Sequence, residues 1–331
     1  MYTPKTVVIV HNSVDNSSSP DELDVLAQVD AVSNALDSLD FLPVPLAVTL
    51  NLEETASRLK ELNPYCAFNL FESVESTGRF ITFAPAVLDH LRIPYTGAGT
   101  SEIFVTTSKV LTKERLMHMG LPTPRWTTID NILKEPEAFP FPCIVKPIFE
   151  DASVGLDSDS VCHDLTTLKQ RMNEYSGNID ELFVEEFVDG REFNISILAS
   201  PQGPEVMPHA EIQFLNFPKE LPRMVGYRAK WDEQSFEAQH TVRRFQKTEK
   251  DKALVSAMTE ISLDCWQTFN LRGYARVDFR VRANGQPEVL EINANPCISP
   301  DSGFVAACNE AKIGYVEMVQ RILMDVRGLN M

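Results

Sequence analysis

The sequence predicts an α/β protein of two or three domains, and three observations lead to this prediction. Short apolar runs alternate with helical patterns over residues 1–108, which is typical of a parallel sheet with helices on its faces. An Asn-Gly pair at 284–285 separates two strand-like runs and indicates a hairpin. The 331 residues are 44% apolar and 23% charged, as in ordinary globular proteins, and this length suits two or three domains.

The charge balance excludes two classes of partner. Acidic residues outnumber basic ones 47 to 30, so the net charge is −17. Such a chain binds nucleic-acid phosphates poorly and is repelled by anionic membrane surfaces. No apolar run approaches the roughly 18–20 residues of a spanning helix, and the run Val7–Val10 is too short for a signal-peptide core. We therefore expect a cytoplasmic protein with no nucleic-acid or membrane partner.

The cysteines indicate a reducing compartment. None of the six forms a CxxC pair, and their spacings match no zinc pattern. We expect free thiols. A catalytic cysteine stays open as an alternative, although the six scattered histidines offer it no obvious partner.

The elements of the first segment follow from the apolar pattern. We expect strands and helices in alternation, with a polar loop at 12–22: strand Val7–Val10, a helix from Leu23, strand Leu42–Val48, helix Leu52–Leu62 and strand Ala67–Leu70. Ligands of such sheets lie beyond the carboxyl ends of the strands. The loops after Val10 and Leu70 are therefore candidate substrate loops.

The middle of the chain is interrupted by prolines and glycines. A helix over Ser108–Met119 should end at Gly120, with prolines just beyond. A strand is expected over Cys143–Pro147 and a polar loop over Glu150–Ser160. Two further strands, Phe183–Val188 and Phe193–Ala199, flank a turn. Soft boundaries near 108 and 190 predict three domains, which span 1–108, 109–190 and 191–331.

The hairpin near residues 274–293 is the most informative stretch. Its first strand alternates apolar with polar residues. If Asn284-Gly285 is the turn, Asp278 lies opposite Glu291 and Arg276 lies opposite Asn293, with all four side chains on one face. Leu290 and Ile292 would then point to the core, and Pro287, which lacks a donor, would need an edge or non-bonding position.

This polar face has the chemistry of a metal and phosphate site. Two carboxylates and a carboxamide are hard oxygen ligands that suit Mg²⁺, and Arg276 beside them suits a phosphate or a developing acyl-phosphate charge. The alternative is a solvated sheet face with Arg–Asp pairs. Opposed carboxylates repel unless something cationic lies between them, which weighs against that alternative.

Five motifs in order resemble those of the ATP-grasp superfamily, in particular its D-alanine–D-alanine ligase-like branch. They are IPYTGAG (93–99) followed by Lys109, FPCIVKP (141–147), FVEEFVDGREF (183–193), RAKW (228–231), and the pair RVDFR and EINANP. The resemblance covers the chain from about Ile93 onward. It implies an N-terminal parallel α/β domain followed by a two-domain ATP-grasp clamp.

The resemblance implies a role for each matching residue. Glu185 would accept from the adenine amino group, the backbone of Phe187 and Val188 would meet the ring edge, and Glu192 would bind the ribose. ATP phosphates would contact Lys109, Lys146 and Lys230, with Ser153 on a mobile lid. Two Mg²⁺ ions, with Mn²⁺ possible, would be held by Asp278, Glu291 and Asn293. Arg276 would meet the transferring phosphate or the tetrahedral intermediate.

The chain departs from the related ligases around the lid. The loop from Glu150 to Gly155 has one glycine, and Ala152 stands where those enzymes carry a hydroxyl. Trp231 stands where they usually have a tyrosine.

The substrate side departs further. Glu22 is the nearest match to a glutamate that grips the first substrate's amine, with Asp15 and Asp24 as rivals. Glu72 and Glu75 add negative charge suited to a cation. Cys297 replaces a glycine, and its backbone N–H could still serve an oxyanion hole. Ser302 matches a serine that contacts the second substrate's carboxylate, while Gly303 replaces a leucine and opens the pocket.

The implied reaction joins a small-molecule carboxylate to an amine. The carboxylate attacks the γ-phosphate of ATP, and the amine then displaces phosphate from the acyl phosphate to form an amide. The departures favour a dipeptide-like product other than D-alanyl-D-alanine. A cyclising or non-amino-acid second step, and a nucleotide-binding regulatory protein with little turnover, stay open as alternatives. A homodimer is a possible assembly.

Overall fold

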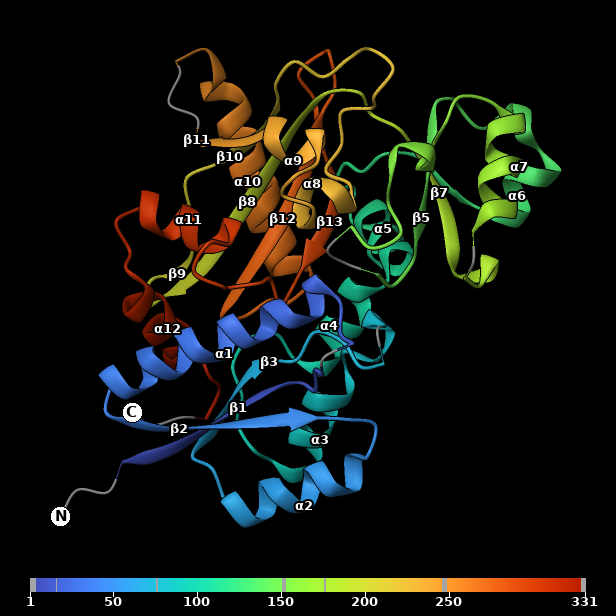
Figure 1. Cartoon of the computed structure of the whole chain (residues 1–331). Coiled ribbons are helices and arrows are strands. Elements are labelled where there is room, and N and C mark those ends of the chain that lie inside the picture. Colours follow the sequence, from blue (N-terminus) through green and yellow to red (C-terminus); the bar gives the residue numbers. More distant parts are fainter. Residues whose placement is uncertain are drawn as a thin grey trace.

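The computed structural model describes residues 4–15, 17–75, 77–150, 153–175, 177–245 and 249–328. Within these ranges the chain forms three sheets with helices packed around them (Figure 1). The α/β fold class predicted from the sequence is confirmed.

The first sheet is parallel, in the order β2-β1-β3, which confirms the prediction from the alternating pattern. Its strands are β1 (Lys5–Asn12), β2 (Phe41–Val48) and β3 (Cys66–Leu70). Helix α1 (Pro20–Ser38) covers one face, and α2 (Leu52–Leu62) and α3 (Phe83–Leu91) lie on the other (Figure 1). Helix α1 begins before the expected Leu23 because Ser19 and Glu22 form a capping box around Pro20.

The second sheet is antiparallel, in the order β4-β7-β5-β6. Its strands are β4 (Trp126–Thr128), β5 (Cys143–Pro147), β6 (Val161–Cys162) and β7 (Leu182–Glu186). Strand β7 ends two residues before the predicted Val188. The helices of this region are α4 (Thr100–Thr107), α5 (Lys109–His118), α6 (Ile129–Lys134) and α7 (Leu165–Glu174). Gly120 follows α5 with a φ of 71°, as its predicted role at the helix end requires.

The third sheet follows the path β11-β10-β8-β12-β13, and β9 pairs with β8. Its strands are β8 (Arg191–Ser200), β9 (Gly203–Val206), β10 (Ala210–Phe214), β11 (Thr241–Phe245), β12 (Tyr274–Val281) and β13 (Pro287–Asn293). The accompanying helices are α8 (Tyr227–Trp231), α9 (Phe236–His240), α10 (Lys252–Thr268), α11 (Gly303–Glu310) and α12 (Tyr315–Met324). Single 3-10 turns lie at 78–80, 136–138, 158–160, 179–181 and 249–251.

The hairpin register is correct at the site and wrong at the turn. Asp278 pairs with Glu291 and Arg276 with Asn293, as predicted, but Val281 pairs with Pro287, one residue out of the predicted register. A β-bulge at Leu290 absorbs the difference. The prediction that Leu290 points to the core is therefore wrong: it is half-buried and lines the pocket, whereas Ile292 is buried. Strand β13 is an edge strand, which suits Pro287.

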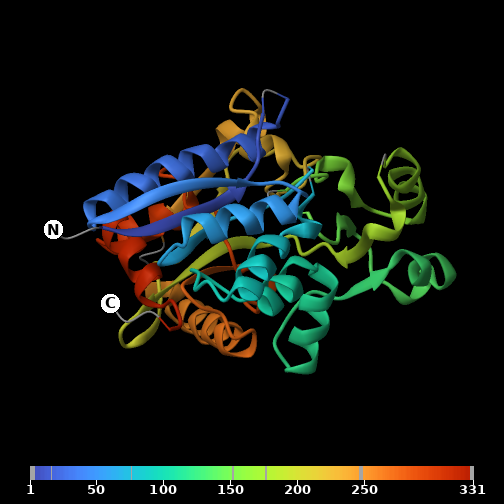
Figure 2. The ribbon, with the colours of Figure 1, turned by 90° about the horizontal axis from the view of Figure 1, so that it is seen from below.

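The first and third sheets share hydrophobic cores. One joins Val8 and Val10 of β1 to Ala275 and Val277 of β12. Another joins the opposite face of β1 to α11 and α12. The second sheet has a core of its own, which explains why its segment projects to one side in both views (Figures 1 and 2).

Each sheet falls within one of the three sequence ranges proposed as domains. The boundaries near 108 and 190 nevertheless stay predictions. In the described part of the chain, no helix is both long and apolar enough to cross a membrane.

Candidate active site

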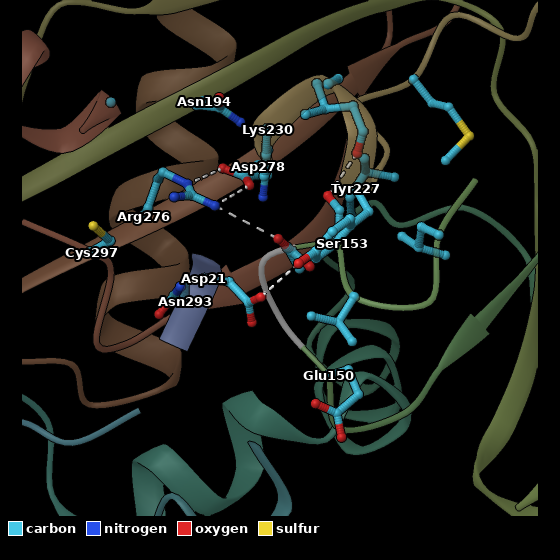
Figure 3. A pocket seen from close by; sticks show the side chains of 18 of the residues that line it. Asp21, Glu150, Ser153, Asn194, Tyr227, Lys230, Arg276, Asp278, Asn293 and Cys297 are labelled. Atoms are coloured by element: carbon cyan, nitrogen blue, oxygen red, sulfur yellow. Dashed lines mark hydrogen bonds and ion pairs between the residues drawn. The ribbon is translucent and has the colours of Figure 1, made fainter. Parts of the chain in front are cut away.

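A cavity of about 800 Å³ lies where the three sheets meet (Figure 3). All of the site residues predicted from the sequence line it, although they come from widely separated segments: Glu22, Glu72, Lys109, Lys146, Ser153, Glu185, Phe187, Val188, Glu192, Lys230, Arg276, Asp278, Glu291, Asn293 and Ser302. The cavity has the size of a small-molecule site. Their roles stay predictions, but the fold brings them together.

Two of the acidic residues considered for the substrate loops lie elsewhere. Asp15 accepts hydrogen bonds from the amide and hydroxyl of Ser17 and does not line the cavity. Glu75 is an exposed turn residue with a φ of 50° and also lies outside it. Asp15 is therefore wrong as a rival to Glu22, because its hydrogen bonds with Ser17 hold it in a local turn outside the cavity. Glu75 is wrong as a partner of Glu72, because its turn also lies outside the cavity.

Glu185 forms the inner wall of the cavity. Its carboxylate is buried and pairs with both Lys113 and Lys146. Burial alone would raise the pKa of Glu185, but the two ammonium groups outweigh burial and lower it. The carboxylate therefore fixes Lys146 at the cavity wall and stays ionised, as an acceptor for an amino group requires.

The neighbouring strands order the rest of this wall. Glu192 is buried and pairs with Arg280 at 2.6 Å. The amide of Phe187 donates to the carbonyl oxygen of Pro142 at 3.0 Å, which ties the segment after β7 to the segment before β5. Glu186 faces away from Glu185 on the strand and pairs with Arg282 at 2.7 Å.

Three cations surround Glu291. The Lys109 ammonium and the Arg276 guanidinium each lie 3.8 Å from its carboxylate. Burial alone would raise the pKa of Glu291, but Lys109, Arg276 and Lys230 outweigh it and lower the pKa to about 2. Lys109 also donates to the carbonyl oxygen of Glu150 at 2.6 Å, at the start of the lid loop. The ionised carboxylate of Glu291 is therefore surrounded by positively charged side chains.

Asp278 is held differently from Glu291. Arg276 donates two hydrogen bonds of 2.8 Å to its carboxylate oxygens (Figure 3). Burial nevertheless raises the pKa of Asp278 to about 6, against the opposing charge of Arg276. Asn293 accepts from the amide of Asn295 at 2.9 Å, which orients its carboxamide oxygen.

These residues fit a Mg²⁺ site by their donor chemistry. Two carboxylates and a carboxamide oxygen emerge from paired positions of β12 and β13. The described residues contain no cluster of three or more His, Cys, Asp or Glu side chains that could hold a metal. Two carboxylates and one carboxamide fill only part of the coordination shell of Mg²⁺. The remaining positions are left for water or phosphate oxygens, which Mg²⁺ commonly retains as ligands.

Hydrogen bonds tie the loop predicted to be a lid to its neighbours in the cavity wall. Ser153, at a φ of 64°, donates through its hydroxyl to the carbonyl oxygen of Val225 at 2.7 Å. The amide of Tyr227 donates to Leu156 at 2.9 Å, and its hydroxyl donates to Asp21 at 2.9 Å (Figure 3). The lid loop, α8 and the start of α1 are therefore joined. Ala152, where the sequence lacks an expected hydroxyl, lies outside the described residues.

The far end of the cavity holds the proposed substrate residues. Cys297 donates to Asp24 at 3.0 Å, and Ser299 donates to the same carboxylate at 3.2 Å. Glu72 accepts from Gln28 at 2.9 Å. Burial, with the charges of Glu72 and Asp24, raises the pKa of Cys297, so the thiol stays protonated and the catalytic-cysteine alternative loses support. All six cysteines are free thiols, as predicted.

Sequence reasoning missed three residues that order the site. Lys113, the buried partner of Glu185, follows Lys109 by four residues on α5, and this helical spacing was an available signal. Arg280 continues the alternation of Arg276 and Asp278 on β12 and pairs with Glu192. Tyr227 gave no signal, because its partner Asp21 lies 206 residues away.

Known proteins are similar to this chain in sequence. The chain is 31% identical over 257 residues to the uncharacterized protein y4sG of Sinorhizobium fredii, which covers 77% of this chain and 73% of that protein. It is 30% identical over 240 residues to a D-alanine–D-alanine ligase of Aquifex aeolicus, covering 72% of this chain and 75% of the relative.

Solved structures share the fold. The ATP complex of the D-alanine–D-alanine ligase from Bacillus anthracis superposes with a TM-score of 0.75 at 20% identity, covering 98% of this chain and 97% of that one. The VanG D-Ala:D-Ser ligase of Enterococcus faecalis gives a TM-score of 0.72 at 13% identity, covering 97% and 99%.

The family model for the C-terminus of D-Ala-D-Ala ligases matches residues 116–324, which include the second and third sheets and most of the cavity. The superposition of the fold over 98% of the chain agrees with that match. The chain therefore belongs to the D-Ala-D-Ala ligase family, and its fold is that of the ATP-grasp ligases.

Proposed function

We propose that the protein is an ATP-dependent carboxylate–amine ligase that forms an amide bond and releases ADP and phosphate. The observation that carries the proposal is the convergence of Lys109, Lys146, Lys230 and Arg276 on the Asp278–Glu291 pair within one cavity. Family membership supports it, since three of the four relatives and neighbours described above are ligases by name.

The first step needs positioning and charge neutralisation. A substrate carboxylate oxygen attacks the γ-phosphorus of ATP, the bond from that phosphorus to the bridging oxygen breaks, and ADP leaves. Lys146 is fixed by Glu185, and Arg276 is fixed by Asp278, so both cations are oriented before substrate arrives. Such preorganised charges stabilise a phosphoryl-transfer transition state more than mobile ones do. Bound Mg²⁺, held by Asp278, Glu291 and Asn293, would neutralise phosphate charge.

The second step forms the amide. The amine nitrogen attacks the acyl carbon, the acyl–oxygen bond breaks, and phosphate and a proton leave. Water would compete with the amine for the same carbon, so exclusion of water matters. The hydrogen bonds from Ser153 and Tyr227 that hold the lid over the cavity supply that exclusion.

A product other than D-alanyl-D-alanine remains part of this proposal. It is supported by Gly303, which brings no side chain to the lining of the substrate end, and by the carboxylates of Glu22 and Glu72. The predicted cytoplasmic location and homodimer stay predictions.

The test is a phosphate-release screen of amino acids and related carboxylates in pairs, with product masses measured. The expected result is ADP, phosphate and a product lighter by one water than the sum of the pair. A product lighter than a single substrate by one water would favour the cyclising alternative. No phosphate release above that of an Arg276→Ala variant would contradict the proposal. The regulatory alternative expects loss of Arg276 or a metal ligand, and all four residues are present.

A further inference from the structure

Arg243 is a cavity residue that the nucleotide and metal assignments do not use. It lies on β11 opposite Ile212 of β10, and both residues line the cavity, so this face of β11 looks into the site. Its guanidinium reaches the start of α11. A Cβ atom at Gly303 would lie 3.5–3.6 Å from the guanidinium atoms. Glycine at this position therefore places no side chain between the start of α11 and Arg243, where a Cβ atom would be in ordinary van der Waals contact with the guanidinium.

The guanidinium has no hydrogen bond or ion pair to any residue that the structure describes. Arg276 and Arg280 in the same cavity are each fixed by a carboxylate. Arg243 lines the cavity and is exposed to solvent. Two residues earlier on the same face, the hydroxyl of Thr241 is buried and has no partner among the described residues. Donors without partners are therefore gathered on this wall.

The local electrostatics favour an incoming anion. Desolvation by the surrounding protein and the charge of Arg276 lower the pKa of Arg243, and Asp301 opposes them only in part. Arginine does not lose its proton in proteins, so Arg243 stays positively charged although its surroundings disfavour that charge. An oxyanion placed against the guanidinium would stabilise the charge. Arginine also matches carboxylate and phosphate groups geometrically, with two parallel hydrogen bonds.

We propose that Arg243 and Thr241, with the space left by Gly303, form a subsite for an oxyanion on the side chain of the substrate that lies against α11. This inference rests on the proposed ligase function, in which that substrate supplies the amine. The oxyanion is a carboxylate or a phosphate in addition to the substrate's own α-carboxylate. Acidic amino acids, or peptides with an acidic residue, are the matching class.

The test is calorimetric titration of the full-length protein, saturated with ADP and Mg²⁺, with each enantiomer of glutamate, glutamine and phosphoserine. Glutamine has the shape of glutamate without its charge. We expect glutamate or phosphoserine to bind at least about tenfold more tightly than glutamine, since hydrogen bonds between charged groups are the strong ones. The preferred probe identifies which oxyanion the subsite takes.

Three variants test whether Arg243 causes the preference for the charged probe. Arg243→Gln should abolish the preference for the charged probe. Arg244→Gln is the matched control, because Arg244 is the next residue on β11 and is exposed like Arg243 but does not line the cavity. It should keep the preference. Gly303→Leu fills the space in front of Arg243 without removing its charge and should also abolish the preference, which keeps the test valid if Arg243→Gln folds poorly.

Equal binding of glutamate, phosphoserine and glutamine would overturn the subsite, and so would an unchanged preference in Arg243→Gln. These outcomes differ from failure of the ligase proposal. If no substrate pair releases phosphate but the charged probe binds through Arg243, the subsite stands without the reaction. If phosphate is released with neutral amino acids and Arg243→Gln binds every probe as the wild type does, the reaction stands without the subsite.

Discussion

Asp278 and Glu291 lie opposite each other on β12 and β13, yet the pKa values of their carboxyl groups shift in opposite directions. Burial raises the pKa of Asp278 to about 6, whereas the cations around Glu291 lower its pKa to about 2. Arg276 and Lys230 act on both carboxyl groups, but Glu291 also faces Lys109 and Lys146, whereas the negative charge of Glu291 itself raises the pKa of Asp278. A further cation near Asp278 would lower its pKa toward that of Glu291, which is the electrostatic argument for a metal ion there.

Glu291→Gln should keep the fold and reduce turnover by at least about tenfold to a hundredfold, the loss that even indirect disturbance of metal sites produces. A neutral amide is a weaker ligand for Mg²⁺ than a carboxylate. Phosphate release should be measured against Mg²⁺ concentration, with thermal unfolding as the check on the fold. Glu288→Gln is unsuitable as a control, because Glu288 is buried against Arg282. The exposed Glu205→Gln serves instead. An unchanged rate and Mg²⁺ dependence in a folded Glu291→Gln protein would remove Glu291 from the site.

Tyr227→Phe should loosen the lid without affecting the fold. The variant loses the 2.9 Å hydrogen bond to Asp21 that joins α8 to α1 across the cavity. If the loop excludes water as proposed, Tyr227→Phe should give more ATP hydrolysis per amide formed and a roughly fivefold to tenfold higher KM for ATP, as the loss of about one hydrogen bond implies. The ratio of phosphate to amide product is the measurement. Asp21→Asn, which keeps an acceptor, should fall between Tyr227→Phe and the wild type, and a wild-type ratio in Tyr227→Phe would rule out the closure role.

Glu185→Gln should destabilise the protein by about 3–5 kcal/mol, because it leaves the buried Lys113 without its counter-charge. Adding Lys113→Met should recover part of that loss, since a hydrophobic side chain needs no partner. Urea unfolding of the two single variants and the double variant measures the coupling. The adenine role predicted for Glu185 is tested separately by comparing ATP with GTP at subsaturating concentration in the wild type. Additive losses in the first test, or equal use of both nucleotides in the second, would contradict these interpretations.

His209 should make the free energy of unfolding depend on pH. Burial lowers the pKa of His209 to about 4, from 6.5 for an unperturbed histidine, and its ring contacts the Thr259 hydroxyl at 3.1 Å. Between these values the unfolded chain binds a proton that the folded chain does not, so stability should fall as pH drops from about 6.5 to 4. The contribution is about 3 kcal/mol over that window. His209→Gln should flatten this part of the urea-unfolding profile, and a profile that stays parallel to the wild type would show that His209 is not responsible.

The sequence could predict the polar face of the hairpin, because alternation and an Asn-Gly turn need only local residues. It could not predict the bulge at Leu290. Next to the turn the pairing differs from the predicted register by one residue, since Val281 pairs with Pro287. The bulge at Leu290 restores the predicted register, so Asp278 still lies opposite Glu291. Bulges depend on how a strand packs across its whole length, which an alternating pattern does not reveal.

Contacts between segments that are far apart in the sequence are the second feature that sequence analysis could not predict. Either Arg243 or Arg244 could face the cavity, and the choice depends on the register of β11 with β10, some 30 residues earlier in the chain. Asp15 and Asp21 are equally acidic in sequence, but one closes a turn with Ser17 and the other meets Tyr227. Charge and spacing indicated the loops that hold the substrate residues, while only the folded chain separates the loop residues that enter the cavity from those that do not.

The last prediction concerns the substrate end of the cavity: one substrate carries an ammonium or guanidinium group. It depends on loops that are far apart in the sequence. Strands β1 and β3 are neighbours, so the loops that follow them open at one edge, and Glu22 and Glu72 both line the cavity there. Glu72→Gln should raise the KM of a cationic substrate by about tenfold and leave the KM for ATP unchanged, because the charge is lost far from the nucleotide half. Glu75→Gln is the matched control, three residues away and outside the cavity. The assay compares alanine with lysine, arginine and bulkier amino acids, in both enantiomers, by phosphate release. If D-alanine paired with itself gives the highest turnover, and Glu72→Gln behaves like Glu75→Gln, the acidic residues at this end are structural and the protein makes the same product as its named relatives.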